Sequence, residues 1–423
     1  MTEKDSGDAM NPPANNTRYF DDSVRFITEL AKSIERYGGH SHDTDKTVLH
    51  IITVLGLKGE ILAVPGSMII ALWQDDLHHQ TIHMTTNRQT NYDMARFGKV
   101  RDLIGDVERG RISPAEGLTR LTEIERAPAV YGNLPKAFAF FLAGVGFGVI
   151  LGISWLDVFI GGVLGLMAFG VELLAARSNL VVNNIPELTI SLVIAFFAGI
   201  IGAGLPGIHP LAVTVCALTI YIPGFGLTIA PREIILGDTL SGIVYFANAL
   251  FVCLKLLLGT ILGLGIAHYI FPVAVAEPLA GVDPVFVWFF IPLLLVSNGI
   301  LFGVSPGKLW LVIVCGLLVW AGVTLGNLFG FWQGTFLAAI ILAVYARIAA
   351  YRFKIPLSTV LLPVVLILVP GFSFIQALYM FNADQLVAGI GAVFQVVVVT
   401  AAIICGIFIG DLVGSSNWLK KTG

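Results

Sequence analysis

The sequence has few charged residues and few cysteines, and each shortage narrows its class. Asp, Glu, Lys and Arg make up 13% of the 423 residues, while 56% are hydrophobic and the mean hydropathy is +0.84. A chain of this length with so little charge is too apolar for a soluble protein. All four cysteines fall inside apolar runs with no CxxC spacing, so we expect neither disulfides nor a zinc site.

The sequence also lacks the short motifs of common catalytic and metal centres. HExxH, GxSxG and the P-loop are absent, and a net charge of −3 gives no reason to expect nucleic-acid binding. Six of the eight histidines lie near the beginning of the chain: His40, His42, His50, His78, His79 and His83. Imidazoles bind divalent ions, but GGHSH and DDLHH are typical of polar turns, which favours surface or pH-sensing histidines. We therefore expect no metal and no cofactor.

Charge is concentrated at the beginning of the chain. Residues 1–135 contain 34 of the 53 charged residues, and the other 288 contain 19. This contrast predicts a polar head and a membrane body, with the boundary near YGNLPK at 131–136. The first thirty residues have no apolar core flanked by basic residues, so we expect no cleavable signal and a cytoplasmic head. The predicted parts are a disordered tail (1–17), a cytoplasmic α/β (α+β) domain (18–135), a first five-helix repeat (136–271), an outer linker (272–284) and a second five-helix repeat with a cytoplasmic tail (285–423).

The head is predicted to combine helices with short strands. Residues 21–39 carry an apolar stripe of helical spacing that ends at a Gly-Gly pair, and a second helix is expected at 43–56. The segments GEILAVPG, SMIIALWQ and QTIHMTTN are typical of short strands. Two more helices are predicted at 91–111 and 113–126, and the second has Ser113 as its N-cap, followed by Pro114 and Glu116.

The body contains ten apolar runs, as in an α-helical polytopic membrane protein. They span 136–154, 156–175, 188–206, 210–224, 241–271, 285–303, 306–323, 328–347, 357–370 and 385–411. Several approach the ~20 residues that cross a bilayer, and two are shorter, as broken helices often are. The loops near 155, 207, 272–284, 324 and 371–384 have no Lys or Arg, while the alternate loops carry Arg177, Arg232, Lys308, Arg347, Arg352, Lys354, Lys420 and Lys421. The positive-inside rule then predicts a multi-pass protein of the inner or plasma membrane with both termini in the cytoplasm.

Two segments of the body match each other at a constant separation. Pro223 and Gly224 correspond to Pro370 and Gly371, because 370 − 223 = 147. The same separation relates Phe225, Gly242, Ile243, Gly259 and Gly263 to Phe372, Gly389, Ile390, Gly406 and Gly410. Five is an odd number of helices, so the second copy must enter the membrane from the opposite side. We therefore predict two inverted five-helix repeats with a helix break in each, as in many secondary transporters.

In these motifs the chain resembles the threonine/serine exporter family, which is related to two-component bacterial succinate exporters. The resemblance rests on ILAVPGSMIIALWQDD and VRDLIGDVERGRISPAEGLTRLTEI in the head, and on IPGFGLTIAPREIILGDTLSGI and LVPGFSF in the body. It implies a ten-helix exporter of small hydroxylated amino acids, driven by the proton gradient. Export of a small dicarboxylate such as succinate stays open as the alternative.

Polar residues inside the apolar runs are the candidate substrate ligands. Ser241, Asn248 and Lys255 are spaced by seven, so they form one stripe that drifts by only ~20° per step on a helix. A mid-helix lysine costs about 2.5–3.5 kcal/mol on insertion scales, so Lys255 must face a cavity, a partner or water. Gln395 occupies the position of Asn248 in the second repeat, and Asn298 lies in the sixth run. The alternative is interhelical hydrogen bonding, which is slightly favoured for Asn298.

Proton coupling requires a group that titrates as access alternates. Asp238 and Glu233 flank the first helix break, and Glu172 borders the second run, as Glu187 borders the third. Asp238 is the first candidate because it precedes a helix start beside the polar stripe. Each carboxylate could instead be a helix cap or a partner of a nearby arginine.

Three classes of function fit these observations. The leading interpretation is a secondary exporter whose partners are a small amino or carboxylic acid, protons and lipid, and a homo-oligomer stays open. A membrane-bound hydrolase would consume its substrate, and the missing nucleophile and base count against it. A passive channel would conduct without responding to an imposed pH gradient.

The predicted topology can be tested by labelling single cysteines on intact cells with an impermeant thiol reagent. We expect Glu277→Cys, in the outer linker, to be labelled and Arg352→Cys, in an inner loop, to be protected. Labelling at 352 without labelling at 277 would contradict the inverted repeat.

Overall fold

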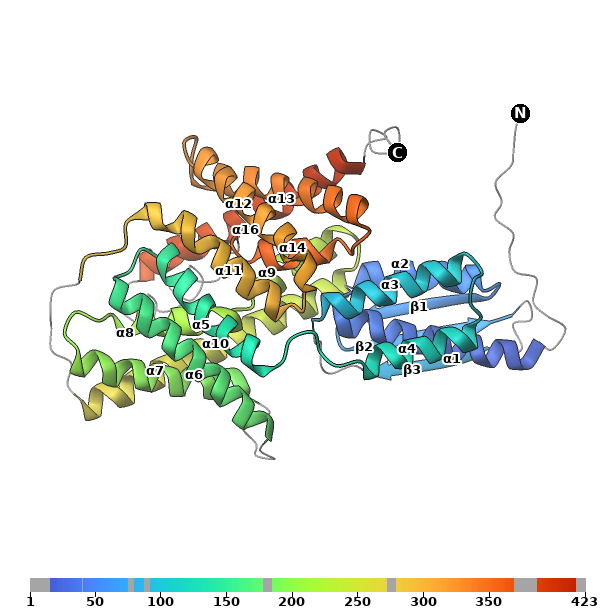
Figure 1. Cartoon of the computed structure of the whole chain (residues 1–423), viewed down its shortest axis with the longest axis horizontal. Helices are drawn as coiled ribbons and strands as arrows, with labels where there is room; N and C mark the ends of the chain where they lie inside the picture. The colour runs from blue at the N-terminus through green and yellow to red at the C-terminus, as the bar shows by residue number, and fades with distance from the viewer. Residues whose placement is uncertain are drawn as a thin grey trace. The chain divides into compact units, whose positions relative to one another are not determined.

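A computed structural model describes residues 16–39, 41–74, 80–86, 92–177, 185–271, 279–368 and 386–415. The chain divides into two compact units (Figure 1). The head unit is Met1–Val130 with Arg232–Tyr245, and the membrane unit is Tyr131–Pro231 with Phe246–Gly423. Joining Arg232–Tyr245 to the head was not expected from the sequence, which predicted one boundary at 135.

Within the described residues, the head unit contains four complete helices and a three-stranded sheet. In chain order they are α1 Asn16–Tyr37, α2 Ser41–Val54, β1 Lys58–Val64, β2 Ser67–Trp73, β3 Thr81–Thr86, α3 Met94–Glu108 and α4 Pro114–Arg126. The strands are antiparallel in the order β1-β2-β3 (Figure 1). Gly66 turns the chain between the first two strands at φ +85°, a conformation that glycine adopts readily. The predicted tail at 1–17 lies outside the described residues except for Asn16 and Thr17, which begin α1.

The head has its own apolar core between the helices and one face of the sheet. The five apolar residues of the predicted helical stripe, Val24, Ile27, Leu30, Ala31 and Ile34, are all buried. On β2, Met68, Ile70 and Leu72 alternate with more exposed neighbours and face the same core. At the start of α4, the Ser113 hydroxyl accepts a hydrogen bond from the Glu116 N–H at 3.3 Å, as expected for an N-cap.

Two side chains form hydrogen bonds with the backbone of Ala63 at the unpaired edge of β1. The Ser241 hydroxyl donates to the Ala63 carbonyl at 3.2 Å, and the Asp45 carboxylate accepts from the Ala63 N–H. An edge strand exposes unpaired backbone groups, so these two bonds satisfy both of them at this residue. Ser241 lies at the beginning of the long helix α10 (Thr239–Ile270), which explains why Arg232–Tyr245 belongs to the head unit.

The Asp45 carboxylate of this contact has a raised pKa. Burial and, to a smaller extent, the negative charges of Asp238 and Glu233 together raise its pKa to about 7, against the lowering effect of the Ala63 N–H. The protonated form of Asp45 is therefore favoured in the folded head below about pH 7.

The membrane unit consists mainly of helices where the structure describes it, and two of them continue into the segment Arg232–Tyr245 of the head unit. Its elements are α5 Asn133–Ile150, α6 Trp155–Arg177, α7 Pro186–Gly204, α8 Pro210–Ala217, η2 Thr219–Tyr221, α9 Gly224–Ile235, α10 Thr239–Ile270, η3 Pro284–Phe286, α11 Val287–Leu301, η4 Pro306–Lys308, α12 Leu309–Gly326, α13 Phe331–Phe353, α14 Ser358–Val365 and α16 Leu386–Ser415. In the described part of the chain, eight helices are long and apolar enough to cross a membrane. The prediction of a polytopic membrane protein is therefore confirmed.

Two of the ten predicted runs do not form long helices. The fourth run forms α8, which bends by 58° into the segment Thr219–Ile235. The ninth forms α14, whose eight residues extend only about 12 Å at 1.5 Å per residue. The second predicted break, at Pro370 and Gly371, lies outside the described residues. The described part of the chain thus contains eight long spans where ten were expected, or nine if the bent pair counts as one.

Two helix pairs of the membrane unit pack through glycines in the same way. A Cβ at Gly263 on α10 would lie 2.8 Å from the Cβ of Ala195 on α7, and also against the Leu192 carbonyl. A Cβ at Gly410 on α16 would lie 2.6 Å from the Cβ of Ala343 on α13 and 2.9 Å from the Ile340 carbonyl. Gly259 and Gly406 make the corresponding contacts one turn earlier, with Leu188 and Ser191 in the first pair and with Phe336 and Ala339 in the second. The glycines are 147 residues apart and their partners 148.

The first structural prediction concerns the pH dependence of the head. Asp45 has a folded pKa above its unfolded value, so its contribution to stability is complete below about pH 4 and is lost as the pH rises through about 7. Asp45→Asn keeps the acceptor for the Ala63 N–H and cannot ionise. Hydrogen exchange of the β1 amides in the full chain should therefore become slower in this variant at alkaline pH and stay unchanged at acidic pH. Asp21→Asn, at an exposed position on α1, is the control and should have no effect.

The second prediction concerns the close approach of α7 and α10. Gly263→Ala should destabilise the membrane unit by about 1–3 kcal/mol, because its Cβ overlaps backbone atoms that cannot move aside. Gly265→Ala on the same helix meets no atom within 4 Å and should be neutral or stabilising. Thermal unfolding of the two purified variants compares them directly, and equal stability would contradict the packing.

Candidate functional site

The first helix break is a short irregular segment between α8 and α9. Cys216 and Ala217 end the regular part of α8, one 3₁₀ turn follows, and the Gly224 N–H bonds to the Ile222 carbonyl at 2.7 Å across Pro223. Proline lacks an N–H, so the helix ladder cannot continue through this point. The break turns Tyr221 toward α6, where its hydroxyl donates to the Glu172 carboxylate at 2.6 Å.

Lys255 is paired with a carboxylate of the neighbouring helix. Its ammonium donates to Glu187 Oε2 at 2.7 Å, and the two side chains are 31% and 23% exposed. Glu187 is the second residue of α7, and Lys255 lies about halfway along α10. The Ser191 hydroxyl, one turn along α7, lies 3.5 Å from the Lys255 carbonyl. The contact of Ser191 with Gly259 holds the two helices close enough for the ion pair to form.

These two pairs form one polar cluster, which we define as Glu172, Tyr221, Glu187 and Lys255. Glu187 is close enough for its charge to act on the Tyr221 hydroxyl. The residues come from α6, η2, α7 and α10, beside an apolar cluster that includes Ile190, Leu218 and Leu256. Apolar surroundings strengthen the attraction between opposite charges and make an unpaired charge costly.

Sequence reasoning named three of the four residues of the polar cluster. Lys255 was a predicted ligand, Glu172 and Glu187 were named as carboxylates that could couple protons or cap a helix, and Tyr221 was not considered. The sequence contains a feature that indicates Glu187 and another that indicates Tyr221. Glu187 follows the proline that starts α7, and Tyr221 precedes Ile-Pro-Gly at the break. An acidic residue opposite the mid-helix lysine was required on electrostatic grounds, and the linear sequence did not show which one.

The other predicted ligands do not lie together in one place. Ser241, Asp238 and Glu233 belong to the head unit, where Ser241 bonds to Ala63. Glu233 has no exposed surface, and its Oε1 lies 3.6 Å from Arg232 Nη1. The structure therefore places the beginning of the predicted stripe and Lys255 in different units.

Three amide side chains have separate surroundings. Asn248 on α10 and Gln395 on α16 are exposed. Asn298 on α11 is buried, and its amide donates to the Pro363 carbonyl of α14 at 3.0 Å. That bond joins two helices and fits the interhelical role that the sequence slightly favoured for Asn298.

A second ion pair joins the other glycine-packed helices. Arg347 Nη2 on α13 lies 2.7 Å from Asp411 Oδ1 on α16, with the side chains 33% and 27% exposed. Lys255 and Glu187 correspond to Ala402 and Thr335 at the separations of the two pairs, 147 and 148 residues. The two helix pairs therefore share their packing and differ in the position of their charges.

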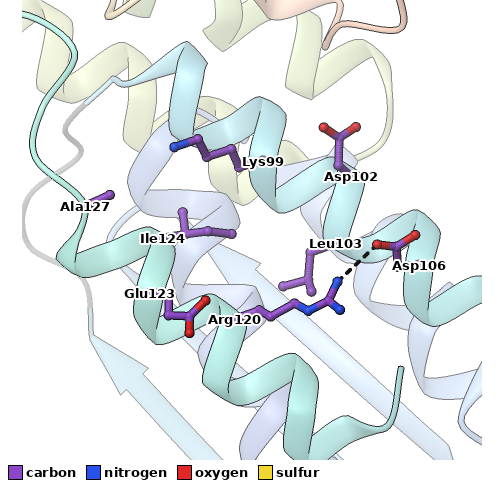
Figure 2. Close-up of a pocket in the computed structure, with 8 residues that line it drawn as sticks. All are labelled: Lys99, Asp102, Leu103, Asp106, Arg120, Glu123, Ile124 and Ala127. Atoms are coloured by element: carbon purple, nitrogen blue, oxygen red, sulfur yellow. Dashed lines mark hydrogen bonds and ion pairs between the residues drawn. The ribbon is translucent and has the colours of Figure 1, made fainter. Parts of the chain in front are cut away.

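The head carries a shallow pocket of about 340 Å³ between α3 and α4. Figure 2 shows Arg120 directed across the groove toward Asp106, to which it bonds at 3.3 Å. Arg120 also bonds to Glu116 at 3.0 Å. Arg120 is therefore held in exposed ion pairs, which contribute little to stability.

The histidines of the head are dispersed where the structure describes them. His50 on α2 lies 3.3 Å from Glu108, and His83 lies on β3 with a buried Nε2. Among the described residues, no three His, Cys, Asp or Glu side chains are grouped so as to hold a metal ion. His40, His78 and His79, with the side chain of His42, lie outside the described part.

Comparison with known proteins adds the family to this geometry. Residues 25–267 match the family model described as "Putative threonine/serine exporter", and residues 286–413 match "Threonine/Serine exporter, ThrE". Pheromone-regulated membrane protein 10 of Yarrowia lipolytica is 25% identical over 56% of this chain and 20% of its own length. The protein of the same name from Saccharomyces cerevisiae is 22% identical over 82% of this chain and 46% of its own length.

The matched region spans less than half of each of these curated relatives. No solved structure matches the chain. The first family model alone covers more than half of the chain, and the second covers most of the remainder. The chain therefore belongs to the threonine/serine exporter family.

Proposed function

We propose that the protein is a secondary active exporter of small amino acids of the threonine and serine type, driven by exchange for protons. The observation that carries the proposal is the ion pair between Lys255 and Glu187 in the polar cluster. The proposal places the protein in the inner or plasma membrane with its head and both termini in the cytoplasm, as the loop charges predict.

An ion pair in apolar surroundings offers one positive and one negative group, which can pair with the two opposite charges of a zwitterionic substrate. The carboxylate of an amino acid can take the place of Glu187 beside the Lys255 ammonium, while its ammonium pairs with Glu187 or Glu172. Every charge then keeps a partner, so that entry of the substrate leaves no ion uncompensated. A dicarboxylate such as succinate supplies no cation and would place negative charge against Glu187. The pair therefore favours amino acids over the dicarboxylate alternative.

The same carboxylates account for exchange with protons. A proton on Glu187 removes the negative charge that would hold the substrate's ammonium. Proton and substrate then compete for one site, and this mutual exclusion is the requirement for antiport. Tyr221, which already donates to Glu172, connects this competition to the helix break, because its position depends on the turn at Pro223.

The repeated glycine packing supports two inverted five-helix repeats around the site. A second match lies at the junction between the first two helices of each half, where FGVILGIS at 147–154 corresponds to NGILFGVS at 298–305. Gly152 and Gly303 end their helices at φ +66° and +64°. Inverted repeats allow the site to open alternately to the two sides by rocking one helix group against another.

The decisive experiment is efflux from reconstituted vesicles loaded in turn with threonine, serine and succinate, with and without a pH step. We expect a pH step to accelerate release of the amino acids more than that of succinate. A channel would release substrate without responding to the step, and a hydrolase would consume it. Faster release of succinate would favour the dicarboxylate alternative.

The site itself can be tested by removing each charge of the ion pair. Lys255→Met should abolish export, and Glu187→Gln should weaken both export and its pH dependence. The exchanged pair Lys255→Glu with Glu187→Lys restores a helix contact but reverses the field at the substrate, so abundance should recover without export.

Arg347→Met is a matched control, because it breaks an interhelical ion pair of the same 2.7 Å length. It should lower export only as far as it lowers abundance in the membrane. Normal export by well-inserted Lys255→Met would remove the proposed site and leave the ion pair as a structural contact.

The predicted amide ligands can be tested in the same assay. Asn248→Leu and Gln395→Leu should each weaken apparent substrate affinity, and their effects should be coupled in a double-mutant cycle if both side chains touch one ligand. Additive effects would assign them to separate places, as their exposed positions on α10 and α16 also allow.

A further inference from the structure

A buried carboxylate lies between the beginnings of α6 and α8, away from the polar cluster. Asp157 has no exposed surface. Its Oδ2 accepts the Ser154 hydroxyl at 2.8 Å and lies 3.3 Å from His209 Nδ1, and its Oδ1 accepts the His209 backbone N–H at 3.0 Å. The Asp157 N–H in turn donates to the Ser154 hydroxyl at 3.1 Å.

The imidazole of His209 connects this carboxylate with solvent. Its side chain is 46% exposed, although it contacts a fully buried acid. Helix capping accounts for the bonds to Ser154 and to the His209 backbone, because both satisfy N-terminal groups of a helix. It does not account for the contact with the ring, since the backbone bond would form with any side chain at position 209.

The corresponding position in the second half carries the opposite charge. LGIS at 151–154 and FGVS at 302–305 are 151 residues apart and end their helices in the same way. At that separation Lys308 takes the place of Asp157, and its ammonium lies over the ring of Phe353 at 5.2 Å. The helix junction therefore does not require a carboxylate, and Asp157 needs another explanation.

We propose that His209 and Asp157 form the site at which the exporter takes up its proton on the outer side. This inference rests on the proton exchange of the proposed function and on the loop charges, which place the beginnings of α6 and α8 outside. A proton from the outer water bonds to Nε2 of neutral His209, while the Nδ1 proton is donated to Asp157. Imidazole suits this role because it gains and loses a proton near neutral pH.

Proton binding changes the free energy needed to close the outer side of the protein over His209. The empty pair has a net charge of −1, and the protonated pair is neutral. Covering His209 removes it from water, which is costly for a lone buried charge and much less so for a neutral, hydrogen-bonded pair. The outer side should therefore close preferentially when the proton is bound, which couples the proton to the conformational change.

Among the described residues, few other titratable groups face this pair. Cys216, two turns along α8, is buried, and the Asp157 carboxylate is close enough for its charge to act on the thiol. The segment 281–283 packs against Ile153 and Ser154, and its Asp283 is directed to the N–H of Val285 at 2.9 Å. The resolved surroundings therefore leave Asp157 as the carboxylate in contact with the His209 ring.

The test compares three variants of the full chain in vesicles. His209→Gln removes the titrating ring, and Asp157→Asn keeps a side chain that can cap a helix but cannot ionise. His268→Gln is the control, because His268 is exposed near the end of α10 on the same predicted side. Efflux is measured at fixed inner pH while the outer pH varies between about 6 and 8, where imidazole titrates.

We expect wild type and His268→Gln to share one pH profile. His209→Gln and Asp157→Asn should be inserted normally and give efflux that is flat within about twofold over this range. A preserved profile in either variant would overturn the proposal. A wild-type profile that is already flat would overturn it as well.

A second measurement does not depend on transport. The histidine NMR signals of the full chain in nanodiscs are followed against pH, and that of His209 is identified by its loss in His209→Gln. Asp157→Asn should move the His209 ring signals, because the Nδ1–H loses the carboxylate that accepts it. Unchanged His209 signals would refute the pair. If no substrate is exported by wild type, the proposed function fails, and this titration still decides whether the proton site exists.

Discussion

The requirement that every charge in an apolar helix has a partner governs the arrangement of the membrane unit. Lys255 can be accommodated on α10 because Glu187 lies 2.7 Å away on α7. This distance requires the two helices to approach closely, and Gly259 and Gly263 provide the space where any Cβ would meet the backbone of α7. The glycine packing and the candidate site are therefore parts of one constraint, and the choice of α7 as partner follows from it.

One helix pair in each half of the body has the same glycine packing, but the two halves carry different charged residues. Their glycine contacts agree residue by residue, but charged residues occur at different positions in each half. Ala402 occupies the position that corresponds to Lys255, and Lys308 occupies the one that corresponds to Asp157. Main-chain packing tolerates little change, because glycine has no replacement at a close contact. Polar side chains can be exchanged wherever a new partner is available. The repeat therefore predicts the helices and leaves the ligands open.

Several predictions from sequence were correct because they depended on local rules. The apolar stripe of α1, the three short strands, the cap at Ser113 and eight of the ten predicted apolar helices all follow from periodicity, turn residues and composition within one segment. The prediction of one polar stripe on α10 was wrong at one end, because the helix is longer than a membrane is thick. The helix has 32 residues, about 48 Å, and exceeds a hydrocarbon layer of about 30 Å. Its beginning extends into the head, where Ser241 bonds to the edge of β1.

The sequence alone determined the membrane class, the polar composition of the head, the 147-residue spacing of the matching glycines and the family resemblance, because each is a property of residues close together in the chain or at a constant separation. Tertiary structure decided which charges meet. Glu187 and Lys255 are 68 residues apart, as Asp157 and His209 are 52 apart. No periodicity relates such residues, and their contact depends on which helix faces pack together. The physical reason is that pairing energy in an apolar medium depends on distance in space, which a linear sequence does not contain.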